Sequence, residues 1–316
     1  MARVSKLPRR LQPMLATLVD APFDNPDWLF ESKWDGFRVV TSIEAGKVTL
    51  YSRNGQIISN SYAPIAKALE AIGADAVIDG ELVALDAQGR SRFQLLQNAL
   101  RTRANLRYCV FDLMFLGGQD LRSLPLIERK QRLRKIVPKH KLLSVSRHRR
   151  GQGRRYFEQA ANDGQEGLIA KRAASPYLSG VRSRDWLKIK TGKRQEVVIV
   201  GFTAPRRSRQ YFGSLVMALR EANQWRYAGH VGTGFTQLQL ETLHARLWPL
   251  RTEKSPFRQP VKDEAVTTWV KPKLVGEVKF TEWTAAGEMR HPAFLGLRGD
   301  KAPADVVREK EGRPPT

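Results

Sequence analysis

Cysteine is almost absent from this sequence, and long hydrophobic runs are missing altogether. The 316 residues include a single cysteine, Cys109, so an intrachain disulfide framework and a cysteine-rich zinc site are both excluded. Cys109 stands inside the apolar run YCVFDLMF, which indicates a packed core position. No stretch approaches the ~20 apolar residues needed to cross a bilayer, and the basic start has no apolar segment of signal-peptide length. From these absences we expect a cytoplasmic protein.

The common nucleotide-binding and hydrolase signatures are also missing. The sequence contains no G-x-x-x-x-G-K-[ST], no G-x-G-x-x-G after an expected strand, no H-E-x-x-H and no G-x-S-x-G. The Gly-rich stretch HVGTGF (230–235) is typical of a hairpin turn rather than of a phosphate-binding loop. These absences argue against P-loop enzymes, dinucleotide-binding domains, zinc proteases and serine hydrolases.

Acidic residues are scarce relative to basic ones. The chain has 54 Lys and Arg against 31 Asp and Glu, a net charge of +23. Such an excess indicates a polyanionic partner, and nucleic acid is the first candidate. Residues 122–155 hold thirteen Lys and Arg with Glu128 as the single acid. A solvated basic face would explain this stretch, but the overall charge favours contact with a phosphate backbone.

The pattern of short strands and few helices predicts an α+β protein of about two domains. Residues 28–115 read mostly as strands, with turns at EAGK (44–47) and SRNG (52–55). After TGKRQ (191–195) the pattern changes to four or five strands and one helix over ~110 residues, which suits a small OB-type barrel. We expect domains at 1–192 and 193–303, followed by a flexible tail at 304–316. Helices are expected at 62–73, 92–101, 126–137, 155–164 and 237–250, and a loop at 147–155.

The stretch WLFESKWDGFRVV (28–40) places Lys33 among aromatic residues in what otherwise reads as a buried strand. A lysine amine is a nucleophile only when it is deprotonated, and apolar surroundings or nearby cations lower its pKa. Lys188 and Lys190 in LKIK lie on one face of an expected strand and would supply such cations. The alternative is a surface lysine that pairs with Asp35.

Lys33 belongs to an ordered series of motifs. They are K-x-D-G-x-R (33–38), SRNG (52–55), DGE (79–81), FD (111–112), EGLIAK (166–171) and LKIK (187–190). This series resembles the covalent nucleotidyltransferases, which comprise ATP-dependent DNA ligases, RNA ligases and mRNA capping enzymes. Within them the sequence most resembles the ligase module of bacterial non-homologous end-joining (LigD-type) DNA ligases, over residues 11–301. The chain would then be a stand-alone ligase or one domain of a larger protein.

The resemblance implies a fold and a reaction. The fold would be an ATP-grasp-like adenylation domain of antiparallel sheets with flanking helices, followed by an all-β OB barrel. Lys33 would attack the α-phosphate of ATP and carry AMP as a phosphoramidate. AMP would pass to the 5′-phosphate at a nick, and the 3′-OH would then displace it.

The resemblance also implies roles for individual residues. Glu166 would help to hold Mg²⁺ or Mn²⁺, with Asp35 near the metal and the 3′-OH, and Glu81 would reach the ribose hydroxyls. Taken alone, Glu81 and Glu166 would pass for charges on a strand surface and in a turn. The remaining nucleotide contacts implied are Phe111 stacking on adenine, Glu31 at the adenine edge, Lys188 and Lys190 on the α-phosphate, Arg38 on nucleotide or nick, and Arg53 on the 5′-phosphate.

In the second domain, RHPAFLGLRGDK (290–301) offers Arg298 and Lys301 to the pyrophosphate leaving group, with solvated surface as the alternative. The expected DNA contacts are Arg53, Arg182, Arg184, Arg206 and Arg207. The expected partners are nicked or broken duplex DNA and a Ku-like end-binding protein, with the enzyme acting as a monomer.

Two rival functions stay open from the sequence. The first is an RNA ligase or a GTP-using capping enzyme, which shares the lysine chemistry. The second is a basic DNA end-binding protein with an inactive nucleotidyltransferase fold.

Overall fold

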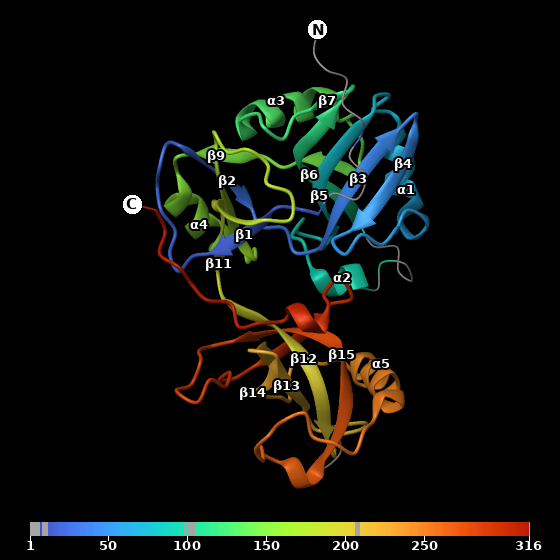
Figure 1. Ribbon diagram of the computed structural model, residues 1–316, viewed down its shortest axis with the longest axis vertical. Coiled ribbons are helices and arrows are strands. Elements are labelled where there is room, and N and C mark those ends of the chain that lie inside the picture. The colour runs from blue at the N-terminus through green and yellow to red at the C-terminus, as the bar shows by residue number, and fades with distance from the viewer. Residues whose placement is uncertain (1–6, 8–11, 98, 100–104, 206–208, 316) are drawn as a thin grey trace. The chain divides into compact units, whose positions relative to one another are not determined.

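The computed structural model describes residue 7 and residues 12–97, 99, 105–205 and 209–315. Contacts divide the chain into two compact units (Figure 1). The first runs to Thr191 and also includes the C-terminal residues from Lys310, and the second is Gly192–Glu309. Among the described residues, no helix is long and apolar enough to cross a membrane.

The first unit contains two sheets. One has the order β1-β11-β10-β2-β9. Its strands are β1 (Leu15–Leu18), β2 (Trp28–Ser32), β9 (His148–Arg150), β10 (Gly167–Arg172) and β11 (Arg182–Lys190). The other has the order β4-β3-β5-β6-β7, with β8 beside β6. Its strands are β3 (Phe37–Glu44), β4 (Lys47–Ser52), β5 (Ala76–Leu85), β6 (Asn105–Leu116), β7 (Gln119–Asp120) and β8 (Leu143–Val145).

Most strand pairs are antiparallel, as expected, but β1 pairs with β11 and β6 with β8 in parallel. The turn between β3 and β4 falls at Ala45–Gly46, where both residues have positive φ (49° and 77°). Glycine adopts this left-handed conformation without a steric cost, so EAGK is a fitting hairpin turn and the prediction is confirmed.

The helices of the first unit flank the sheets. They are α1 (Ala63–Glu70), α2 (Phe93–Gln97), α3 (Leu126–Ile136) and α4 (Gly153–Asn162), with a short 3₁₀ turn at Asn60–Tyr62. Three of the predicted helices appear where expected, and α2 covers the part of 92–101 that forms a helix among the described residues. The predicted loop at 147–155 is wrong, because β9 pairs with β2 there and α4 begins at Gly153.

Strand alternation separates the two faces of the β2–β10–β11 sheet. Residues opposite each other on paired strands share a face. One face carries Trp28, Phe30, Leu168, Ala170, Leu187 and Ile189, which form an apolar cluster with α4. The opposite face carries Glu31, Ile169, Lys171, Trp186, Lys188 and Lys190. This polar face meets the second sheet through a cluster that joins Trp186 to Val40, Val77 and Phe111.

The second unit is built on one sheet with the order β14-β13-β12-β15-β16. Its elements are β12 (Lys193–Thr203), β13 (Leu215–Glu221), β14 (Gln224–Val231), α5 (Gln237–Leu247), β15 (Thr267–Phe280) and β16 (Ala293–Leu297), with 3₁₀ turns at Trp248–Leu250, Glu264–Val266 and Pro303–Asp305. Helix α5 starts with a capping box: Thr236 Oγ1 accepts from Gln239 N–H, and Gln239 Oε1 accepts from Thr236 N–H. The five strands and one helix confirm the predicted composition of this part.

The described residues of the flexible tail expected at 304–316 make several contacts. Val306 is buried in the core of the second unit. Gly312 N–H donates to Leu18 O (3.0 Å), and Asp20 N–H donates to Gly312 O (3.1 Å). The segment after Lys310 therefore extends the edge of β1 by main-chain pairing. The prediction for this segment rested on its polar and proline residues, which do not indicate such pairing.

Cys109 should be unreactive in the folded protein. It lies in β6 with no exposed surface, and burial raises the pKa of its thiol to about 12. Because the thiolate is the reactive form, we expect no modification by an aromatic disulfide reagent at pH 8 and one modified thiol after denaturation. Rapid stoichiometric labelling of the native protein would contradict the core position.

Candidate active site

Lys33 follows β2 directly and is held beside β10. Its N–H donates to Gly167 O (2.9 Å), and its ammonium pairs with Glu166, the residue before β10. The two side chains are 18% and 4% exposed, so the lysine is reachable while its carboxylate partner is enclosed. The prediction that the neighbouring aromatics surround Lys33 is wrong for Trp28 and Phe30, which pack on the opposite face of the sheet.

The loop after Lys33 joins the two sheets. The Asp35 N–H donates to Ser91 Oγ (3.0 Å), and Asp35 is only 7% exposed. A side chain at Gly36 would collide with the carbonyl oxygen of Leu82 in β5. Glycine is therefore required at this close approach, which fixes the position of the chain that follows Lys33.

Lys188 and Lys190 lie where the LKIK motif predicted, on one face of β11. Lys188 is opposite Ile169, and Lys190 is opposite Gly167, the residue after Glu166. Both lysines are half-buried. Two cations on the face that Glu31 and Glu166 approach can neutralise a phosphate between them.

Glu31 is buried between two lysines. Lys130 Nζ donates to Glu31 Oε1 (2.6 Å), and Lys171 Nζ donates to Glu31 Oε2 (3.1 Å). Burial alone raises the pKa of Glu31, but the two ammonium groups outweigh burial and lower it. Burial lowers the pKa of Lys171 to about 8, against the opposing effect of Glu31. The carboxylate predicted at the adenine edge is thus kept ionised by fixed partners.

Phe111 sits in β6 under two cations. The Arg38 guanidinium lies 4.6 Å and the Lys171 ammonium 4.0 Å from the centre of its ring, and the residue is 6% exposed. Core packing and cation–π contacts therefore account for Phe111 in this structure. Its stacking on adenine stays a prediction.

Arg38 is fixed by a bidentate ion pair. Its Nε and a terminal nitrogen donate to the two carboxylate oxygens of Asp79, at 2.5 and 2.6 Å. Burial opposes the charge, but Asp79 outweighs it and raises the pKa of Arg38. The Tyr177 hydroxyl donates to the same carboxylate (2.6 Å), so Arg38 reaches the site as part of a rigid group.

Glu81 and Arg53 lie on the second sheet. Glu81 is half-buried on β5, directly opposite Arg38 on β3. Arg53 is half-buried in the turn after β4, where Gly55 N–H donates to Ser52 O (2.8 Å). Their contacts with ribose and 5′-phosphate stay predictions.

The carboxylates near Lys33 suit a hard cation only if phosphate and water complete its shell. Among the described residues, no group of three or more His, Cys, Asp or Glu could enclose a metal ion. Mg²⁺ keeps several waters and is often bound by one or two carboxylates plus substrate phosphates. Glu166 and Asp35 fit that mode, and their assignment stays a prediction.

In the second unit, Arg298 and Lys301 are tied to acidic partners. Arg298 donates to both oxygens of Asp300 (2.9 Å each) and to Glu277 (3.3 Å), and Lys301 pairs with Glu196 (2.7 Å). Burial would raise the pKa of Glu196, but Lys301 and Arg298 lower it to about 2. These pairs connect the loop after β16 to β12 and β15, and contact with pyrophosphate stays a prediction.

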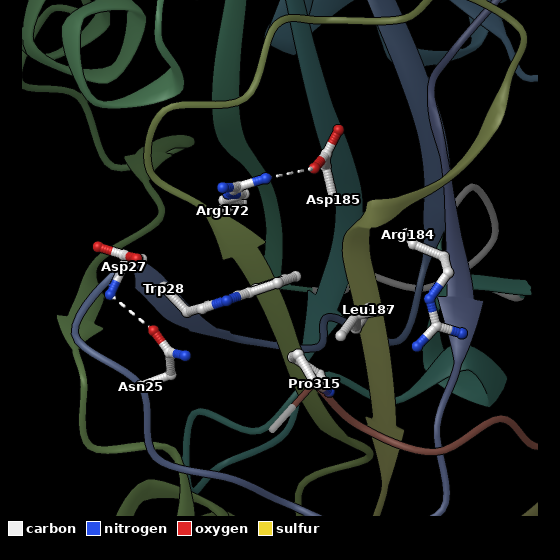
Figure 2. A pocket seen from close by; sticks show the side chains of 8 residues that line it. All are labelled: Asn25, Asp27, Trp28, Arg172, Arg184, Asp185, Leu187 and Pro315. Atoms are coloured by element: carbon white, nitrogen blue, oxygen red, sulfur yellow. Dashed lines mark hydrogen bonds and ion pairs between the residues drawn. The ribbon is translucent and has the colours of Figure 1, made fainter.

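The predicted DNA contacts are only partly described. Arg182 and Arg184 are exposed on β11, where they donate to Ala16 O (2.5 Å) and Arg313 O (2.8 Å). Arg206 and Arg207 lie outside the described residues. Arg184 also lines a surface pocket beside Trp28 and Pro315, which Figure 2 shows. The pocket includes Trp28 and Leu187 from the face turned away from Glu31, so it is separate from the site of Lys33.

The buried cations of α3 were not predicted from the sequence. Arg129 forms a bidentate pair with Asp112 (2.8 and 2.9 Å), and both side chains are fully buried. Lys130 is equally buried against Glu31. A signal was present, because Leu126, Arg129, Lys130 and Leu133 follow the i, i+3, i+4, i+7 spacing of a buried helix face. The sequence predicted a helix with a basic face in contact with phosphate or, alternatively, solvent, whereas Arg129 and Lys130 are buried against carboxylates of the protein itself.

The comparisons with known proteins agree with this geometry. Residues 13–190 match the family described as ATP dependent DNA ligase domain, and residues 208–301 match ATP dependent DNA ligase C terminal region. The chain is 39% identical to the multifunctional non-homologous end joining protein LigD of Pseudomonas aeruginosa, over 98% of this chain and 38% of that protein. It is equally 39% identical to the LigD of Mycobacterium tuberculosis H37Rv, over 95% of this chain and 40% of that protein.

A solved structure of mycobacterial DNA ligase D complexed with ATP and MES is 37% identical, with a TM-score of 0.72. The match covers 95% of this chain and 98% of that one. The expected adenylation and OB folds are confirmed, while the chain spans only about two fifths of the curated LigD relatives. The chain belongs to the ATP-dependent DNA ligase family.

Proposed function

We propose that the chain is an ATP-dependent DNA ligase that joins a 3′-OH to a 5′-phosphate through a covalent Lys33–AMP intermediate. The observation that carries this proposal is the ion pair between Lys33 and Glu166, with Lys188 and Lys190 on the adjoining strand face. Family membership over residues 13–190 supports the same reaction.

In the proposed first step the Lys33 amine attacks the α-phosphate of ATP, and pyrophosphate leaves. Lys33 must release its proton to attack, and Glu166 is the carboxylate in contact with it. Lys188 and Lys190 would stabilise the negative charge that develops on the α-phosphate. AMP then passes to the 5′-phosphate of the nick, and attack by the 3′-OH releases it.

A divalent cation fits this site through Glu166 and Asp35. Mg²⁺ or Mn²⁺ would supply charge neutralisation on the phosphate oxygens. Glu31 and Phe111 would bind the base, Glu81 the ribose, and Arg38 and Arg53 the phosphates of nucleotide and nick. Arg298 and Lys301 would assist departure of pyrophosphate.

The exposed cations between residues 134 and 155 would extend the contact with DNA. We call these residues the basic surface: Arg134, Lys135, Lys139, Lys141, Arg147, Arg149, Arg150, Arg154 and Arg155. Within the described part of the chain, none of the nine forms an ion pair with a carboxylate. Side-chain contacts connect the three elements that carry this surface. Arg134 of α3 lies 3.3 Å from His148 Nδ1 of β9, and the Arg149 guanidinium of β9 lies over the ring of Tyr156 in α4.

Replacing Arg149, Arg150, Arg154 and Arg155 by alanine should weaken DNA binding without changing lysine adenylylation. A plot of log affinity against log salt has a negative slope. For every phosphate that the variant no longer neutralises, the magnitude of this slope should decrease by about 0.9. The slope is measured by fluorescence anisotropy with a nicked duplex. A control variant, Lys47→Ala with Lys67→Ala, removes two exposed cations elsewhere on the first unit and should leave the slope unchanged. Equal slopes for the wild type and the quadruple variant would rule out this surface.

The rival functions differ in nucleotide and substrate. Labelling of the protein by α-labelled GTP instead of ATP would favour a capping-type enzyme, and sealing of nicked RNA but not nicked DNA would favour an RNA ligase. The proposal requires labelling by ATP and sealing of nicked DNA. An end-binding protein without activity would bind the nicked duplex and carry no label.

The wider setting is proposed from the relatives. Their names specify non-homologous end joining, which would give this chain a repair role and a Ku-like end-binding partner. We further propose that it acts as a monomer in the bacterial cytoplasm. The single buried thiol suits a reducing compartment.

A further inference from the structure

Lys130 is a buried cation that contacts both residues proposed to bind the base, Glu31 and Phe111. It lies on α3 with no exposed surface, although burying an ammonium is costly unless its donors are satisfied. Its Nζ donates to Glu31 Oε1 (2.6 Å), Ser146 O (3.2 Å) and Phe111 O (3.4 Å). One ammonium therefore connects β2, β6 and the segment after β8.

The adjacent residue on the helix provides a comparison within the same fold. Arg129 is equally buried, but it binds Asp112 and the carbonyl oxygens of Leu124 and Ser175. None of these three groups has a role in the proposed reaction. Arg129 secures the helix to β6 and the loop after β10, whereas Lys130 holds two residues that the proposed reaction places on the base.

The Glu31 carboxylate has acceptor positions that the two lysines do not use. A carboxylate has about four acceptor positions. Lys130 and Lys171 each take one, on different oxygens. Lys171 is itself fixed over the rings of Phe111 and Trp186, at 4.0 and 4.2 Å. The ionised and immobile carboxylate can still accept from an exocyclic amino group, and it would repel a carbonyl oxygen in the same position.

We propose that Lys130 is a positioning residue for base selection, which holds the Glu31 carboxylate and the Phe111 backbone in the arrangement that favours a 6-amino purine over a 6-oxo purine. The inference rests on the proposed function, since it concerns the nucleotide that Lys33 takes. Lys130 itself need not touch the base. Its effect passes through Glu31, and both residues are fully enclosed.

The test compares formation of labelled protein from α-labelled ATP and GTP. For Lys130→Met we expect the preference for ATP, as a ratio of kcat/KM values, to fall by about tenfold, which equals about 1.4 kcal/mol of differential binding. The preference for ATP should decrease mainly because the KM for ATP increases. Lys130→Arg keeps a cation and should restore part of the preference. The control, Arg129→Lys, should lower the melting temperature and leave the preference unchanged.

A double variant separates positioning from general unfolding. If Lys130 acts through Glu31, Glu31→Gln combined with Lys130→Met should show the same ATP preference as Glu31→Gln alone. Additive effects, or a preference within twofold of wild type in Lys130→Met, would overturn the inference. If Lys130→Met does not fold, Lys130→Arg becomes the test variant. Replacing the ammonium with a guanidinium moves the positive charge, so the preference for ATP over GTP must still change. A wild-type protein that takes no label from ATP would instead contradict the proposed function.

Discussion

Replacing Lys33 with alanine should abolish nick sealing and remove all acid-labile AMP from the protein. The Lys33 nitrogen is the only atom proposed to form a bond to the α-phosphate. Glu166, Lys188 and Lys190 are proposed to act through their charges, and none of them is proposed to carry AMP. Removal of a covalent nucleophile commonly costs many orders of magnitude in rate, so we expect activity below detection. Gel analysis with α-labelled ATP and with a labelled nicked duplex measures both effects.

The control for this prediction is Lys33→Arg. Arginine keeps the positive charge beside Glu166 but stays protonated, so it should be as inactive as alanine. Both variants should bind nicked DNA nearly as well as wild type, because the basic surface is unchanged. Nick sealing by either variant would mean that another residue carries AMP.

Removing Arg129 should cause the largest decrease in stability among single substitutions in the first unit. Its guanidinium and the Asp112 carboxylate are both fully buried and joined by two hydrogen bonds. Arg129→Met leaves a buried, unpaired carboxylate, which typically costs about 3–5 kcal/mol. Thermal and urea unfolding followed by circular dichroism measure the change.

The matched double variant, Arg129→Met with Asp112→Leu, should recover most of that stability. Replacing both members of a buried ion pair by apolar residues of similar size is often neutral. A decrease of less than about 1 kcal/mol for Arg129→Met alone would place this pair in the range of solvated surface pairs. The account of α3 as a helix anchored by its cations would then be wrong.

The grouping of the candidate catalytic residues was predictable because their motifs follow one another in a distinctive order along the chain. Lys33, Glu166, Lys188 and Lys190 stand in short motifs, and the structure brings all four to neighbouring positions. The hairpin turn at Ala45–Gly46 was predictable because its conformation requires specific residues.

The partners of the buried cations could not be predicted, because the sequence shows a charge but not the distant residue with which it pairs. Lys130 pairs with Glu31, 99 residues away, and Arg129 with Asp112, 17 residues away. Without those partners, the basic run reads as a face turned to phosphate or to solvent. The cations of the basic surface are indeed exposed, whereas Arg129 and Lys130 of α3 are buried. The wrong prediction that Trp28 and Phe30 surround Lys33 could have been avoided from the sequence. Side chains alternate along a strand, so Trp28 and Phe30 lie on the opposite face of β2 from Glu31.

Transfer of AMP from Lys33 to a DNA end can be followed directly in a single turnover. Wild-type protein is labelled with α-labelled ATP, freed of nucleotide, and mixed with a nicked duplex without further ATP. The label should leave the protein, appear on the 5′-phosphate and finally be released as AMP, with one nick sealed for each labelled protein. Label that stays on the protein while nicks remain open, or nicks sealed without any labelled protein, would contradict the account.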